Sequence, residues 1–122
     1  MFQTSAKAKS LAALGIIVKA GHENHVDAAV AGGGVGAMIK VLEHGSDDAK
    51  GIAVAILRSI TEVEKHVAAV VASGGVAALN RVLDEGPDVF IEFHGTKMST
   101  KSNAAHALGL MAEATGVLMY EY

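Results

Sequence analysis

The feature that most constrains this chain is an internal repeat with a period of 41 residues. When the sequence is shifted by 41 residues, His25–Asp47 lies over His66–Asp88, and 13 of the 23 aligned positions are identical. Identity this high between two segments of one chain indicates a duplicated structural unit. A period of this length is that of helical solenoids, which have two or three helices in each unit. We therefore expect an all-α fold with high helix content and no sheet.

Apolar residues recur at helical spacing twice within each unit, in two short helices. In the second unit, Val67, Val70 and Val71 belong to the first helix, and Val76 and Leu79 begin the stripe of the second. Two glycines separate the helices in both units. We expect them to allow a sharp turn between helices that pack almost at right angles.

A third, longer helix is predicted to follow Ser46-Asp47-Asp48, which is good N-cap chemistry. It carries Ala53, Ile56, Leu57 and Ile60 on one face. Thr61–Glu64 is interpreted as a capping box that opens the next unit.

The third-helix pattern occurs three times, which divides the single domain 1–122 into repeats. We expect a partial repeat consisting of a third helix alone (5–20), a repeat (23–61), a repeat with an inserted loop at 89–101 (62–115) and a tail (116–122). The predicted core consists of Val35, Ile39, Leu42, Ile56, Leu57, Ile60, Val76, Leu79, Leu83, Leu108 and Met111.

The segments Val71–Leu79 (VASGGVAAL) and Asn103–Leu108 (NAAHAL) resemble the armadillo repeat family, and the resemblance covers nearly the whole chain. HEAT repeats are the nearest alternative, but they have two helices and lack the glycine pair. The resemblance implies a right-handed α-solenoid of about two and a half repeats. Its third helices would line a concave groove that binds a peptide or a partner protein.

The chain departs from the family pattern at the groove positions of nuclear import receptors. In an alignment of the third helices, the tryptophan position of those receptors corresponds to Ala12, Ala55 and His106. Their asparagine position corresponds to Ile16, Ser59 and Leu110. Because no side chain of either kind is present there, tight binding of basic import signals is not expected.

Two sets of residues are predicted to bind a partner. The residues of the first set occupy equivalent positions relative to the apolar stripe of the third helices, and we expect them on the concave face: Arg58, Ser59, Glu62, His106, Leu110 and Glu113. The second set is Phe90 and Phe93 in the inserted loop, since longer loops of repeat proteins often line a binding rim. Alternatively, both rings fold back and fill the groove between the second and third helices.

The ends of the array are expected to be apolar and to act in self-association or docking. The residues concerned are Leu11, Leu14, Val117, Leu118, Met119 and Tyr120. A homodimer through these ends is expected, and a tail that caps the last repeat is the alternative. The function predicted first is a protein-interaction scaffold; the alternative is a self-assembling solenoid or a piece of a longer array.

Composition argues against other classes. The net charge of −3 does not favour nucleic acid or an anionic membrane surface as partner. No cysteine is present, and no serine, lysine or histidine pattern of a catalytic or metal site is found, so we expect no enzyme, no cofactor and no metal. We expect a cytoplasmic location, with the nucleus as the alternative. Lys7, Lys9 and the apolar run 11–18 also imitate a targeting segment, although they fit the repeat register.

Overall fold

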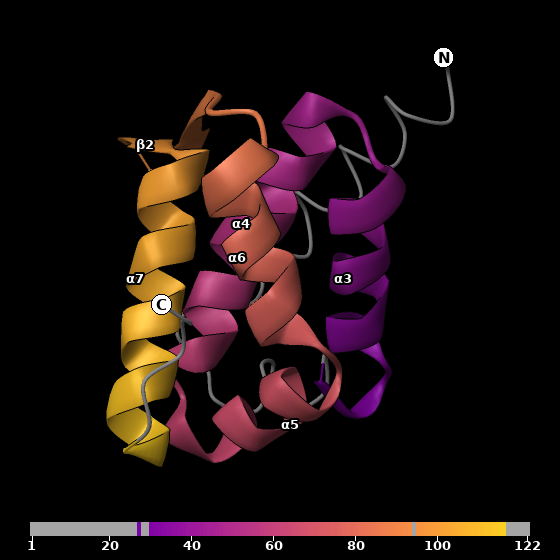
Figure 1. The fold of residues 1–122 in the computed structure, drawn as a ribbon, viewed down its shortest axis with the longest axis vertical. Coiled ribbons are helices and arrows are strands. Elements are labelled where there is room, and N and C mark those ends of the chain that lie inside the picture. The colour runs from indigo at the N-terminus through magenta and orange to yellow at the C-terminus, as the bar shows by residue number, and fades with distance from the viewer. Residues whose placement is uncertain (1–26, 28–29, 94, 117–122) are drawn as a thin grey trace.

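The computed structural model describes residues 27, 30–93 and 95–116, and this part of the chain is mostly helical. Its elements are α3 (Gly34–His44), α4 (Asp47–Thr61), the 3-10 helix η1 (Glu64–His66), α5 (Val67–Ala72), α6 (Gly75–Glu85), β1 (Phe90–Phe93), β2 (Thr96–Ser99) and α7 (Thr100–Thr115). Helices α3, α4, α6 and α7 run roughly along one axis, and the short α5 crosses one end of them (Figure 1). The expected helical class is confirmed. The expectation of no sheet is wrong, because β1 and β2 form an antiparallel hairpin.

The turns before α3 and α6 have the same backbone conformation. Gly33 and Gly74 each have a φ of 86°, and each is the N-cap of an 11-residue helix. A Cβ is strained in this left-handed region, so glycine is favoured at both positions. The bend between Glu64–Ala72 and Gly75–Glu85 is 80°, which confirms the sharp turn predicted for the second unit.

The N-terminus of α4 is capped as its sequence predicts. The Ser46 hydroxyl accepts a hydrogen bond from the Ala49 amide at 3.2 Å, and Asp47 and Asp48 lie in the first turn. The capping box predicted at Thr61–Glu64 is wrong. Thr61 is instead the last residue of α4, and its hydroxyl donates to the Arg58 carbonyl oxygen at 2.8 Å.

The core lies where the helices of the two units meet. Helix α4 packs most extensively against α7, α3 packs against α4, and α6 packs against α7. Nine residues of the predicted core are buried: Val35, Ile39, Leu42, Ile56, Leu57, Ile60, Leu79, Leu108 and Met111. Val76 and Leu83 were predicted to be buried too, but they are only partly covered at the edge of this cluster.

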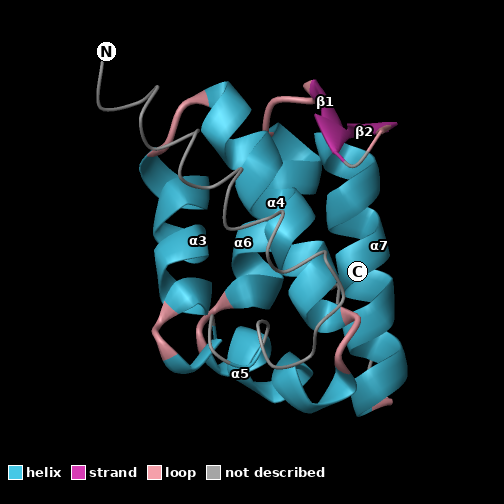
Figure 2. Ribbon diagram, turned by 180° about the vertical axis from the view of Figure 1, so that it is seen from behind, coloured by secondary structure: helices cyan, strands magenta, loops and turns pink. Residues whose placement is uncertain are grey.

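The predicted insertion is present, but it is a hairpin rather than a loop (Figure 2). Its strands pair Phe90 with Ser99 and Glu92 with Lys97, and Gly95 in the turn has a φ of 77°. The Phe90 side chain is 66% exposed, so the interpretation that this ring fills the helix groove is wrong. The side chain of Phe93 lies outside the described part of the structure.

Within the described residues, no single helix has both the length and the apolar composition needed to cross a membrane. One pair of segments passes that test together, and it is the pair bent by 80° at Gly74.

We predict that Leu57→Ala lowers the free energy of unfolding by about 2–5 kcal/mol, because this completely buried side chain leaves a cavity. Urea denaturation followed by circular dichroism measures the change. Val71→Ala is the control, since Val71 is 38% exposed on α5 and its truncation should cost less than about 1 kcal/mol. Equal losses for the two variants would contradict this description of the core.

Candidate partner-binding surface

The structure places the six side chains predicted to share one concave face on two helices, and it gives them different degrees of exposure. His106, Leu110 and Glu113 lie along α7, whose N-terminus is capped by the Ser99 hydroxyl. Arg58 is near the end of α4, and Glu62 follows that helix. His106, Glu113 and Glu62 are exposed and Leu110 is partly exposed. These four residues are therefore accessible to a partner.

Ser59 does not belong to an accessible surface. It is 6% exposed, and its hydroxyl donates to the Ala55 carbonyl oxygen of the same helix at 3.2 Å. Ala55, at the preceding groove position, is only 2% exposed. Both groove positions of α4 are thus buried, and the prediction that Ser59 contacts a partner is not supported by its placement.

Arg58 is directed toward the hairpin. One terminal nitrogen lies 4.0 Å from the Met98 sulfur, and the other lies 3.8 Å from a Glu62 carboxylate oxygen. The Arg58 side chain is 19% exposed, and its Nε is buried without a hydrogen-bond partner. Arg58 therefore supports the hairpin from α4 and offers little of its charge to solvent.

The exposed side of α7 forms an open face, which we define as Ser102, Ala105, His106, Gly109 and Glu113. All five residues are exposed, and their spacing follows one side of a helix. A Cβ built on Gly109 would meet no atom within 4 Å. Glycine inside a helix costs about 1 kcal/mol relative to alanine, and no contact within the described residues requires it here.

The hairpin is held firmly at its base. The Thr100 amide and hydroxyl both donate to the Val89 carbonyl oxygen, at 2.9 and 3.0 Å. The Lys101 amide donates to the Asp88 carboxylate at 3.2 Å. A Cβ on Gly51 of α4 would lie 3.2 Å from Ile91 Cγ2, so the hairpin packs directly on that glycine.

Alternation along the strands gives the hairpin an inner and an outer side. Ile91 pairs with Met98, both are partly buried, and both side chains face α4 through the contacts to Gly51 and Arg58. Phe90, Glu92 and Lys97 are exposed on the other side, and we call them the hairpin face. The hairpin itself stands at the N-terminal end of α7 (Figure 2).

The sequence contained a signal for this hairpin that the repeat comparison missed. Phe90–Phe93 and Thr96–Ser99 are two short runs separated by two residues, the second of which is Gly95. Two-residue connections that contain glycine are typical of hairpins. The predicted terminal apolar residues, Leu11, Leu14, Val117, Leu118, Met119 and Tyr120, lie outside the described residues.

A charged cluster joins the first unit to the second. The Asp27 carboxylate contacts His66 Nε2 at 2.5 Å and Lys65 Nζ at 3.0 Å, although these residues lie 39 and 38 positions apart. Within the described part of the chain, no group of three or more metal-binding side chains is close enough to hold an ion. The cluster is best explained as a link between repeats.

Comparison of the chain with protein-family models, curated proteins and solved structures finds no match in any of the three.

We predict that Asp27→Asn destabilises the fold in a pH-dependent way. A hydrogen bond from His66, and to a smaller extent one from Lys65, holds the pKa of Asp27 below its ordinary value of 3.8. A lowered pKa stabilises the folded state at pH values above the unfolded-state pKa, and this stabilisation is lost as the pH falls through the folded-state value. The stability difference between wild type and variant should therefore shrink as the pH falls below 3.8.

Urea denaturation at a series of pH values measures that difference. Asp84→Asn, a matched change at an exposed acid on α6, controls for the loss of one negative charge. A difference that stays constant from neutral pH to acid would contradict the role given to Asp27.

Proposed function

We propose that this chain is a protein-binding module built as a short right-handed solenoid of armadillo-type repeats. Two features support the architecture: the matching glycine turns at Gly33 and Gly74, and the packing of corresponding third helices, α4 and α7, against one another. The module acts by binding and carries no catalytic site of its own.

The observation that carries this proposal is the exposed Phe90 ring on a braced hairpin. Phe90 is the more exposed of the two large hydrophobic residues that are exposed in the described part of the chain, at 66%. Thr100 and Lys101 fix the hairpin base, so the backbone that carries the ring has little freedom left to lose on binding. Aromatic side chains held in this way are typical centres of protein interfaces.

The partner surface combines the hairpin face with the open face of α7. Glu92 and Lys97 pair across the strands and place opposite charges beside Phe90. His106 and Glu113 of the open face, with the partly exposed Leu110 next to it, add a mixed polar and apolar strip. An aromatic centre with a polar rim is the usual composition of a protein-protein interface. Because Ser59 is buried and Arg58 faces Met98, α4 contributes little to this surface.

A specific observation also favours the alternative, a self-assembling solenoid. Ala55 and Ser59 are buried on α4, whereas the matching residues on α7, His106 and Leu110, are exposed or partly exposed. The open face of α7 therefore has the position that a further repeat or a second copy of the chain would cover.

We predict that Phe90→Ala removes partner binding without unfolding the chain. The immobilised protein is exposed to a cell extract, and bound proteins are quantified by mass spectrometry. The recovered amount of specific partners should fall about tenfold or more with Phe90→Ala, because an aromatic centre carries much of the binding energy. The recovered amount should be unchanged with Val71→Ala, which truncates another exposed apolar side chain, on α5.

Circular dichroism confirms that both variants fold. Recovery of the chain itself as the Phe90-dependent partner would select the self-assembling alternative. Equal recovery by wild type and Phe90→Ala, or equal loss with Val71→Ala, would contradict the proposed surface.

A further inference from the structure

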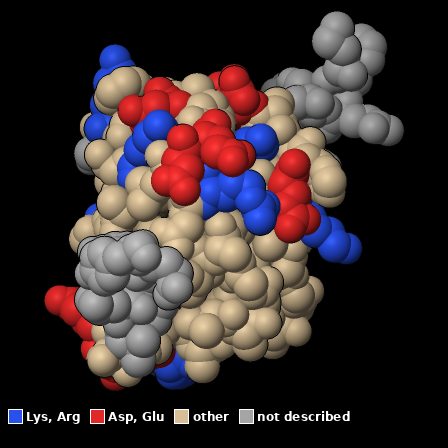
Figure 3. All heavy atoms as spheres, in the orientation of Figure 1, with Lys and Arg blue, Asp and Glu red and all other residues tan. Residues whose placement is uncertain are grey.

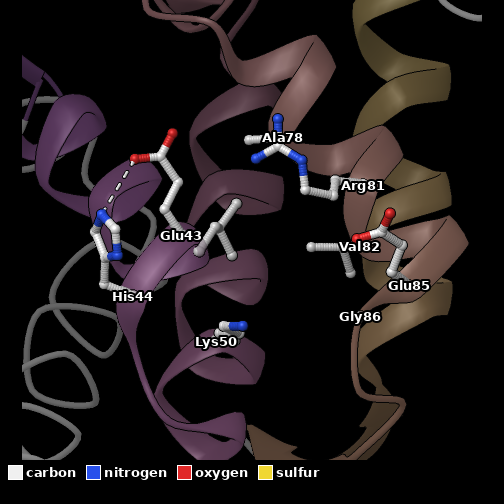
Figure 4. A pocket seen from close by; sticks show the side chains of 9 residues that line it. Glu43, His44, Lys50, Ala78, Arg81, Val82, Glu85 and Gly86 are labelled. Carbon is white, nitrogen blue, oxygen red and sulfur yellow. Dashed lines mark ion pairs between the residues drawn. The ribbon is translucent and has the colours of Figure 1, made fainter.

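A pocket opens between α3, α4 and α6 (Figure 4), apart from the hairpin face and the open face of α7. Its volume is about 440 Å³, which is within the range of small-ligand sites. It lies where the second helices of the two repeats end and the third helix of the first repeat begins.

The pocket has an apolar base and a charged rim. Leu42, Ala78 and Val82 line the base. Around the opening, Glu43 of α3, Arg81 and Glu85 of α6, and Lys50 of α4 come in order of alternating sign (Figure 4). On the face of the molecule that carries α3 and α6, acidic and basic side chains are likewise interleaved (Figure 3).

The rim charges do not neutralise one another. Among the described residues, Arg81, Lys50 and Glu85 make no ion pair or side-chain hydrogen bond within the structure. Glu43 has only a contact of 3.9 Å with His44, whose side chain is 82% exposed. Two cations and two carboxylates thus line one pocket with their charges available to a ligand.

The helix ends around the pocket favour ligand groups of opposite charge at different places. Glu43 and Glu85 lie in the last turns of α3 and α6, where the helix dipoles also favour a cation. Lys50 lies in the first turn of α4, where the dipole favours an anion, and Arg81 adds a guanidinium opposite. A doubly charged phosphate would face both carboxylates, and a simple cation would face both basic groups.

We propose that this pocket binds a zwitterionic ligand, with an ammonium group and a carboxylate a few carbon atoms apart. Because the signs alternate around the rim, each end of the ligand contacts one charged side chain: the ammonium group contacts Glu85 at the end of α6, the carboxylate contacts Lys50 at the start of α4, and the connecting carbons cover Val82. A free amino acid with its amino group at the far end of the carbon chain (an ω-amino acid) has this chemistry, and so does a peptide segment with neighbouring lysine and glutamate side chains.

Nuclear magnetic resonance titration of the ¹⁵N-labelled full chain tests the proposal. The probes are 6-aminohexanoate, its single-charge relatives hexanoate and hexylammonium, and the capped peptide acetyl-Lys-Glu-amide. The zwitterion should cause saturable shifts in the amides of Glu43, Lys50 and Gly86, and either single-charge relative should bind about tenfold more weakly. Saturable binding of the capped peptide would identify a polypeptide as source, and its failure beside binding of 6-aminohexanoate would identify a free small molecule.

Matched variants assign the effect to the rim. Lys50→Gln and Glu85→Gln should each weaken binding of the zwitterion about tenfold, because each removes one charged contact. Lys40→Gln and Asp84→Asn are the controls and should leave binding unchanged, since these exposed residues sit on α3 and α6 but do not line the pocket. The proposal is overturned if no probe saturates, if hexanoate or hexylammonium binds as tightly as the zwitterion, or if the rim variants behave like the controls.

Discussion

The packing of α4 against α3 on one side and α7 on the other is the contact on which the rest of this structure depends. Ten of the fifteen residues of α4 are buried, so this helix is surrounded rather than exposed on one face. Small residues make this possible: Ala49 and Ala53 are completely buried, and a Cβ on Gly51 would lie in tight contact with side chains of the hairpin segment, 3.2 Å from Ile91 Cγ2. The inner side of β1 and β2, the start of α7 and the side chain of Arg58 all take their positions from this helix.

Because α4 is enclosed, binding chemistry has to be found elsewhere. The groove positions Ala55 and Ser59 are buried, and the exposed groove-type residues are on α7. The insertion between α6 and α7 adds an exposed aromatic ring at the N-terminal end of that same helix. One edge of the structure thus carries the proposed interaction surface, while the joint between α3 and α6 forms a separate charged pocket. The two proposed sites involve different helices and can be tested independently.

Repetition in the sequence predicted the features that both units share. The glycine turns, the Ser46 cap and most of the core follow from local chemistry and from spacing within one helix, both of which are readable along the chain. The hairpin was missed because it occurs in one unit only, so the comparison of units treated Val89–Lys101 as a loop. The prediction of a capping box at Thr61–Glu64 was wrong because the Thr61 hydroxyl donates a hydrogen bond to the Arg58 carbonyl oxygen of its own helix. The burial of Ser59 depends on how helices distant in sequence pack together. The same packing brings Lys50 and Arg81 to one pocket. The spacing of residues along the chain does not specify this packing.

Hydrogen exchange of the native protein, measured residue by residue with nuclear magnetic resonance, tests the central role of α4 most directly. Amides that exchange only on global unfolding mark the most stable part of a structure. The account predicts that the amides of Ile56, Leu57 and Ile60 belong to this slowest class, together with that of Leu108 on α7. The hairpin and the short α5 should open more readily. If the α4 amides exchange as fast as those of Glu92 or Ala69 while α3 or α6 stays protected, α4 is not the element that holds the fold together, and the account is wrong.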